Sequence, residues 1–159
     1  MILSIIGIIH TPFQRSSGAP VQASLAGGAE GTVEVYEPFS AGLRDLDGFA
    51  RIWLLYWFDR AALPPESFMV APYLDHQTRG VFSTRAPSRP NRIGLSPVQL
   101  VAIERNILRV RDIDVLDGTP LLDIKPYVPR FDSFPDSRAG WLESVTSGQI
   151  LADDRFEQK

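Results

Sequence analysis

Hydrophobic residues in this chain fall in short runs separated by turn residues. The runs of strand length are residues 2–9, 32–36, 97–103, 108–111 and 121–124, with residues 80–84 as a further strand candidate. Runs of about four to eight residues rich in Val, Ile, Tyr and Phe, bounded by Gly, Pro, Asn or Asp, are typical of strands. The pattern therefore predicts an all-β sandwich or barrel.

Residues 52–58 form the most hydrophobic run, Ile-Trp-Leu-Leu-Tyr-Trp-Phe. A run this short and this aromatic favours a strand buried on both faces. It is far shorter than the roughly 20 residues that a helix needs to cross a bilayer. The residues after Met1 lack a basic region and a small-residue cleavage site, so we expect no signal peptide.

The segments between these runs are expected to be irregular. Residues 14–31 are rich in Ser, Ala and Gly and predict a long loop, residues 38–46 a short helical turn, and residues 61–77 an irregular connection. The later residues Trp141, Leu142, Val145 and Ile150 predict a short amphipathic helix. No long helical pattern alternates with the strands and no Gly-x-Gly-x-x-Gly follows one, so a Rossmann arrangement is not expected.

Composition narrows the class of protein. The 159 residues are 44% hydrophobic and 22% charged, which fits one globular domain. The chain has no cysteine, which excludes a disulfide scaffold and a Cys nucleophile and fits a cytoplasmic protein. His10 and His76 share no metal-ligand spacing, so no metal site is expected.

The distribution of charge is more informative than its sum of -3. No acidic residue lies between Asp75 and Glu104, yet Arg79, Arg85, Arg89 and Arg92 all fall there. Such a stretch can attract a polyanion whatever the net charge. The alternative is a solvated basic loop.

Two runs mix prolines with polar groups, which is typical of loops that hold side chains for a ligand: residues 80–96 and 117–132. In the first run, Arg85 and Arg89 offer planar forks for carboxylate or phosphate, and Asn91 can both donate and accept. The alternative for Asn91 is a turn cap.

In the second run, Asp117-Gly118-Thr119-Pro120 could bind a ribose or an amino-acid group through its backbone N–H groups and side-chain oxygens. An Asp-Gly pair taken alone is more often a hairpin turn. Apart from Lys159 at the end of the chain, Lys125 is the single lysine. It could hold a phosphate or carboxylate, or instead form an ion pair with Asp123 or Asp132.

Taken together, four motifs resemble the TsaA-like (UPF0066) family of TrmO-type tRNA methyltransferases. They are residues 6–13 (Ile-Gly-Ile-Ile-His-Thr-Pro-Phe), 45–49, 80–96 and 117–129. The resemblance covers residues 5 to 132 and implies a compact antiparallel β-barrel over residues 1–135, followed by a C-terminal tail, 136–159. It further implies a homodimer that binds S-adenosylmethionine and methylates N6 of threonylcarbamoyl-adenosine next to the tRNA anticodon.

The resemblance also carries over site residues. It implies that the cofactor is bound by Pro20, Val21, Gln22, Asp59, Arg60, Arg85, Leu95, Asp117, Gly118, Thr119 and Pro120. Relatives often carry His where this chain has Asp59, and larger relatives carry a C-terminal domain that we do not expect here.

Proximity to the Asp117 turn makes Asp123 and Tyr127 candidate general bases, with Lys125 biasing their protonation or holding the substrate. Arg89, Asn91, Arg92 and Arg109 are candidate tRNA contacts. The rival interpretation is a non-catalytic module that binds S-adenosylmethionine or another nucleoside as a sensor or adaptor.

Overall fold

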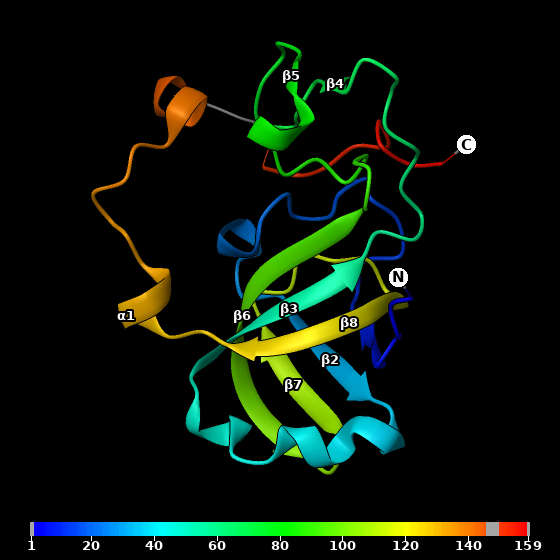
Figure 1. The fold of residues 1–159 in the computed structure, drawn as a ribbon, viewed down its shortest axis with the longest axis vertical. Helices are drawn as coiled ribbons and strands as arrows, with labels where there is room; N and C mark the ends of the chain where they lie inside the picture. Colours follow the sequence, from blue (N-terminus) through cyan, green and yellow to red (C-terminus); the bar gives the residue numbers. More distant parts are fainter. Residues whose placement is uncertain (1, 146–149, 159) are drawn as a thin grey trace.

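The computed structural model describes residues 2–145 and 150–158 and consists mainly of a closed antiparallel β-barrel (Figure 1). Its strands, in the order in which they pair, are β1 (Gly7–His10), β2 (Glu30–Val35), β7 (Ile107–Arg111), β6 (Ile93–Glu104), β3 (Arg51–Trp57) and β8 (Thr119–Pro126), which closes the barrel on β1. The predicted all-β barrel is confirmed. Within the described residues, no helix is long and apolar enough to cross a membrane.

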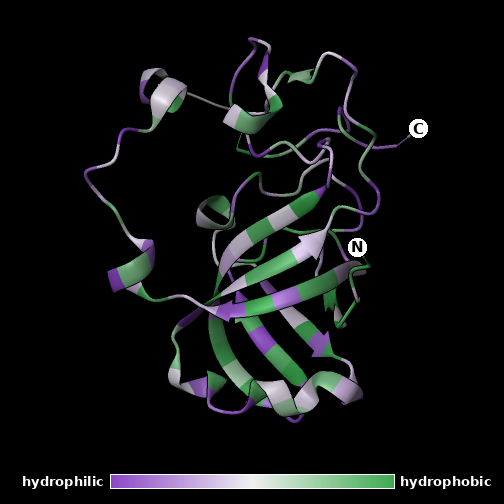
Figure 2. Ribbon diagram, in the orientation of Figure 1, coloured by the Kyte–Doolittle hydropathy of each residue, from purple (hydrophilic) through white to green (hydrophobic). Residues whose placement is uncertain are grey.

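Alternation of side chains along the strands builds the barrel core, and Figure 2 shows hydrophobic and polar positions alternating along them. In β3, Ile52, Leu54 and Tyr56 are buried, whereas the residues between them are only partly buried. The expectation that this strand is buried on both faces was therefore wrong. A strand in a small barrel has one face inside and one outside, and here aromatic side chains occupy part of the outer face.

The lower end of the barrel in Figure 1 is covered by two 3-10 helices, η2 (Glu37–Leu43) and η3 (Leu46–Gly48). Leu46 of η3 is buried and joins the core cluster of the barrel. The helical turn predicted near residues 38–46 is confirmed.

Long loops cover the upper end, and we call them the loop cap: residues 11–29, 58–92 and 150–158. They include η1 (Ala23–Leu25), β4 (Met69–Val70), β5 (Arg79–Gly80) and η4 (Val81–Ser83). The loop cap has its own small hydrophobic cluster of Val70, Val81, Ala86 and Phe156, against which Tyr73 packs.

The strand predicted at residues 80–84 was wrong beyond Gly80, where η4 begins. The hydroxyls of Ser83 and Thr84 donate to the carbonyl oxygens of Gly80 and Val81, at 2.8 and 2.9 Å. Such local side-chain bonds to the backbone compete with a strand ladder.

The C-terminal residues leave the barrel and return to the loop cap. After α1 (Pro129–Asp132), the helix predicted around Trp141 and Leu142 is realised as one 3-10 element, η5 (Gly140–Ser144). Val145 directly follows η5, and Ile150 lies beyond residues 146–149, which are outside the described residues.

Residues 150–158 run beside the other loops of the loop cap. Leu151 pairs with Pro20, and Glu157 pairs with Ala61, each through an isolated bridge. Ala152 and Phe156 are buried. Residues 150–158 thus form part of the loop cap, while the predicted boundary at residues 135/136 stays a prediction.

Candidate functional site

A cavity of about 690 Å³ lies between the upper end of the barrel and the loop cap. This volume is within the range of about 300–1,000 Å³ that is usual for small-molecule sites. Barrel residues such as Tyr56, Gly94 and Thr119 line one side, and Tyr73 and Phe156 line the other. Phe82, which is 78% exposed, also lines it, so the cavity reaches the molecular surface.

Most of the predicted cofactor residues line this cavity: Pro20, Val21, Gln22, Asp59, Arg60, Arg85, Leu95 and Thr119. Hydrogen bonds connect the segments that carry them. The Arg85 guanidinium donates to Oε1 of Gln22 at 2.7 Å, and the Arg60 guanidinium donates to the carbonyl oxygen of Asp117. Residues far apart in the sequence are therefore brought together around one space.

The other predicted cofactor residues, Asp117, Gly118 and Pro120, lie beside the cavity and are not part of its lining. The Asp117 carboxylate accepts hydrogen bonds from the backbone N–H of Thr11 at 3.1 Å and from Nε2 of Gln14 at 3.2 Å. These contacts hold the pKa of Asp117 below its ordinary value. The hydrogen bond from Thr11 has the largest effect, and Gln14 and nearby His10 add to it.

The Asp117-Gly118 turn is not a hairpin, so that interpretation was wrong. It follows β7, which pairs with β2 and β6, and precedes β8, which pairs with β1 and β3. Gly118 has φ +78°, a left-handed conformation that glycine adopts without steric cost. The turn thus carries the chain across the upper end of the barrel and delivers Thr119 to the cavity.

The predicted tRNA contacts separate into two places. Arg89 lines the cavity and donates to the carbonyl oxygens of Thr84 and Ala86, at 3.2 and 3.1 Å. Arg92 donates to the carbonyl oxygen of Ala61 at 2.8 Å. Asn91 is exposed between them. These three residues belong to one loop, and Arg89 of this loop and Ile93, the first residue of β6, line the cavity.

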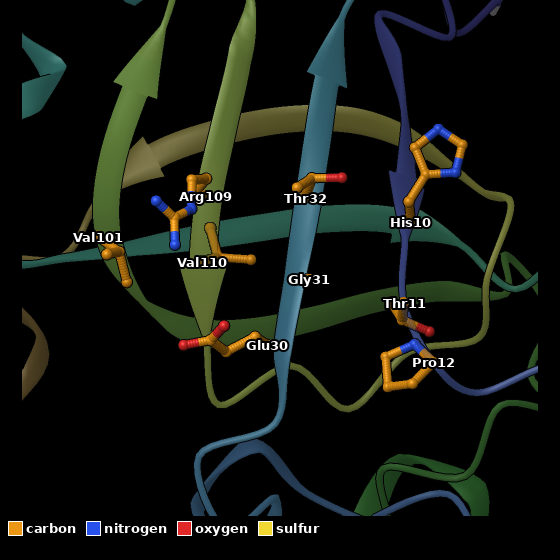
Figure 3. A pocket seen from close by; sticks show the side chains of 9 residues that line it. All are labelled: His10, Thr11, Pro12, Glu30, Gly31, Thr32, Val101, Arg109 and Val110. Atoms are coloured by element: carbon orange, nitrogen blue, oxygen red, sulfur yellow. The ribbon is translucent and has the colours of Figure 1, made fainter.

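Arg109 lies elsewhere, on the outer face of the barrel, in a second hollow of about 350 Å³. Figure 3 shows its guanidinium on β7, with Thr32 on β2 and His10 on β1. Glu30 also lines this hollow, and a hydrogen bond from Arg111 lowers its pKa. The hollow therefore combines both signs of charge.

The predicted catalytic residues Asp123, Lys125 and Tyr127 line neither hollow. Nζ of Lys125 lies 2.8 Å from Oδ2 of Asp123, so the ion pair considered as an alternative role for Lys125 is formed. The Tyr127 ring packs against Trp53, with ring centroids 5.4 Å apart. Both contacts lie away from the cavity, toward the end of β8, and the catalytic roles stay predictions.

Sequence reasoning missed a polar chain at the base of the cavity. The Ser96 hydroxyl donates to Oδ1 of Asp114 at 2.5 Å and shares a hydrogen bond of 2.9 Å with the Tyr56 hydroxyl. A Cβ on Gly94 would lie 2.1 Å from Cε2 of Tyr56, so only glycine lets this ring cross β6. Burial raises the pKa of Asp114 to about 6, and burial also raises that of Tyr56.

The sequence held one weak signal for Asp114. It is a single acidic residue between Ile113 and Val115, which are 0% and 4% exposed. Alternation indicates that Asp114 faces away from its two neighbours. It does not indicate that a cavity lies on that side, because the walls come from loops far away in the sequence.

Comparison with known proteins adds a family match. The model of the tRNA-methyltransferase O N-terminal domain matches residues 8–133. A probable S-adenosyl-L-methionine-binding protein of Pyrococcus abyssi is 56% identical over 138 residues, covering 87% of this chain and 74% of that protein. The tRNA (adenine(37)-N6)-methyltransferase of Escherichia coli is 33% identical over 153 residues, covering 91% of this chain and 65% of that enzyme.

A solved structure shows the same fold. The crystal structure of TrmO from Pseudomonas aeruginosa superposes with a TM-score of 0.75 at 41% sequence identity, covering 90% of this chain. This chain spans 62% of the length of that structure and about two thirds of the Escherichia coli enzyme.

Proposed function

Because this chain belongs to the tRNA-methyltransferase O N-terminal domain family, we propose that it binds S-adenosylmethionine in the large cavity and methylates tRNA. The acceptor we propose is N6 of threonylcarbamoyl-adenosine at position 37, the position in the name of the Escherichia coli relative. The observation that carries the proposal is the convergence of the predicted cofactor residues on one cavity.

The lining suits the chemical groups of S-adenosylmethionine. Tyr73, Phe82 and Phe156 provide apolar and aromatic walls for a purine. Arg85 offers a planar fork for a carboxylate. The Asp114 carboxylate offers an acceptor or a negative charge.

When bound, S-adenosylmethionine supplies a methyl group carried on a positively charged sulfur. The protein's contribution is to hold the acceptor in line, since orientation can supply about 7–11 kcal/mol. We propose that Arg85 and Gln22, already joined by a hydrogen bond, fix one end of the cofactor. The Thr119 hydroxyl donates to the carbonyl oxygen of Leu116 at 2.7 Å. The oxygen of Thr119 can therefore accept a hydrogen bond from the ligand.

The acceptor contacts are proposed from charge and position. Arg89 lines the cavity and Asn91 and Arg92 follow it in the same loop, within the stretch of residues 76–103 that contains no acidic side chain. Arginine contacts to phosphates weaken with salt in proportion to their number. Replacing Arg92 with alanine should therefore weaken tRNA binding and flatten its salt dependence, while an unchanged slope would remove Arg92 from the contact set.

Asp123 and Tyr127 remain our proposed candidates for the proton acceptor, with Lys125 paired to Asp123. Because they lie outside the cavity, they can act only on an acceptor that reaches across the surface of β8, or in a site completed by a second copy. Near-normal turnover by both Asp123→Asn and Tyr127→Phe would exclude the role. Light scattering of the purified chain tests the proposed homodimer.

The test of the proposed function combines binding and transfer. Calorimetry should detect S-adenosylmethionine binding to the wild-type chain. Labelled methyl groups should then enter total tRNA from cells that make the threonylcarbamoyl modification, and not tRNA from cells that lack it. Label in both pools would indicate a different acceptor.

The rival function is a sensor or adaptor that binds S-adenosylmethionine without transferring its methyl group. It is favoured by one observation: the predicted catalytic residues do not line the cavity. Cofactor binding with no label in either tRNA pool would support this rival over the methyltransferase.

A further inference from the structure

Asp114 is a cavity-lining carboxylate that belongs to none of the ion pairs found among the described residues. It is mostly buried and lines the large cavity from the connection between β7 and β8. Each ion pair formed by the described residues joins other side chains. Removing a carboxylate from water without a cation in contact is costly, so burial favours its neutral form, and a bound cation would instead favour the charged form.

The polar contacts of Asp114 fix its orientation. Ser96 donates to its Oδ1 at 2.5 Å, and the Tyr56 hydroxyl supports Ser96 from inside the barrel. The Tyr56 ring is in turn seated by Gly94 and by an edge-to-face contact with Phe58 at 5.2 Å. Tyr56 lies on β3, Ser96 lies on β6, and Asp114 lies between two buried residues, so the carboxylate is preorganised.

We propose that Asp114 is the residue that recognises the positively charged centre of the ligand in the cavity. This inference rests on the proposed function, under which the ligand is S-adenosylmethionine. That molecule carries two cations, a sulfonium and an ammonium, and its demethylated product keeps only the ammonium. Asp114 is thus a specificity-determining residue. A contact between Asp114 and the sulfonium would let the protein distinguish cofactor from product.

The charges around Asp114 support this assignment. Burial raises the pKa of Asp114, and the hydrogen bond from Ser96, backbone hydrogen bonds and the charge of Arg85 lower it only in part. Arg85 is hydrogen-bonded to Gln22, and burial keeps Tyr56 protonated. The other charged groups of the cavity are Asp59, Arg60, Arg89 and Glu157. Hydrogen bonds from Ser16 lower the pKa of Glu157, so that carboxylate stays ionised near neutral pH.

The experiment is calorimetric titration of wild type and Asp114→Asn with three ligands at pH 7.5. S-adenosylmethionine has both cations, S-adenosylhomocysteine has the ammonium alone, and 5′-methylthioadenosine has neither. The matched control is Asp47→Asn, the same change at an exposed carboxylate far from the cavity. Thermal unfolding of each variant establishes that it is folded.

We expect Asp114→Asn to weaken S-adenosylmethionine by at least about tenfold while 5′-methylthioadenosine is unchanged, since a buried charge has lost its partner. A loss for S-adenosylmethionine alone assigns Asp114 to the sulfonium, and an equal loss for S-adenosylhomocysteine assigns it to the ammonium. Equal losses for all three ligands, or no loss, would overturn the inference. If wild type binds none of them, the proposed function itself fails.

A second measurement needs no variant. The pKa of Asp114 is raised to about 6 in the free protein, so the carboxyl becomes protonated as the pH falls from 7.5 to 5.5. Affinity for S-adenosylmethionine should fall over that range, and binding near pH 6 should release protons because the cation favours the ionised form. The affinity for 5′-methylthioadenosine should stay constant, and a parallel fall for it would contradict the inference.

Discussion

The barrel and the loop cap above it are built in different ways. The barrel core is a large cluster drawn from alternate positions of the strands, and Ile9, Val33, Ile52 and Leu54 within it are all 0% exposed. The loop cap rests on a cluster of Val70, Val81, Ala86 and Phe156, contributed by loops and by the end of the chain.

This difference separates stability from function. A region with dense apolar burial opens only when the whole protein unfolds. A region with few buried apolar contacts opens locally at a lower free energy. The cavity lies between the two regions, so one wall rests on the large barrel core and the other on the small cluster of the loop cap. We expect substitutions in the barrel core to destabilise the whole protein. Substitutions in the loop cap should instead weaken ligand binding in the cavity.

The largest expected effect is on the barrel. Leu54→Ala should lower the free energy of unfolding by about 2–5 kcal/mol, because it removes a fully buried side chain and leaves a void. Urea denaturation measures this change. Leu63→Ala, at a side chain that is 75% exposed, is the control and should change little. Equal midpoints for the two variants would contradict the view that the barrel carries the stability.

Gly94→Ala tests the border between the two regions. The new Cβ would lie 2.1 Å from the Tyr56 ring, so the ring must move and its hydrogen bond to Ser96, which in turn holds Asp114, is disturbed. We expect a loss of about 1–3 kcal/mol in stability, as for other overpacked sites, together with weaker S-adenosylmethionine binding. Gly42→Ala, where nothing lies within 4 Å, should affect neither property.

Phe156→Ala tests the loop cap alone. Its ring is 8% exposed and meets Tyr73 edge to face at 5.1 Å. Hydrogen exchange of residues 150–158 should rise by about tenfold or more while the barrel strands stay protected, and cofactor binding should weaken. Phe134→Ala, at a 72% exposed ring, is the control. Exchange that rises equally in barrel and loop cap would show that the two regions unfold as one unit.

The smallest effect is expected at Asp117, which ties the loop cap to the end of β1. Its pKa is lowered in the folded protein, so its stabilisation is present above its unfolded pKa and is lost as the pH falls through the folded value. Because the side chain is partly exposed, Asp117→Asn should cost less than about 1 kcal/mol at pH 7. Unfolding midpoints from pH 7 to pH 2 should converge with wild type below about pH 4, and a constant difference would refute the linkage.

Short-range pattern was enough to predict much of the barrel. The alternation in residues 32–36, 97–103 and 108–111 matches β2, β6 and β7, because the side-chain period of a strand is set by the backbone alone. Pattern failed at residues 80–84, where hydroxyls bond to nearby carbonyls, and at residues 52–58, where hydrophobicity alone could not reveal that one face is outside.

The cavity could not be predicted from the sequence and was decided by the tertiary structure. The chain itself determined strand content, the basic stretch around Arg85 and the residues that its family motifs mark for a cofactor. The fold decided that Arg85 meets Gln22, that Phe156 closes the far wall, and that Asp114 faces the space between them. Such contacts join residues far apart along the chain, and they form only when strand pairing closes the barrel and brings its loops to one end.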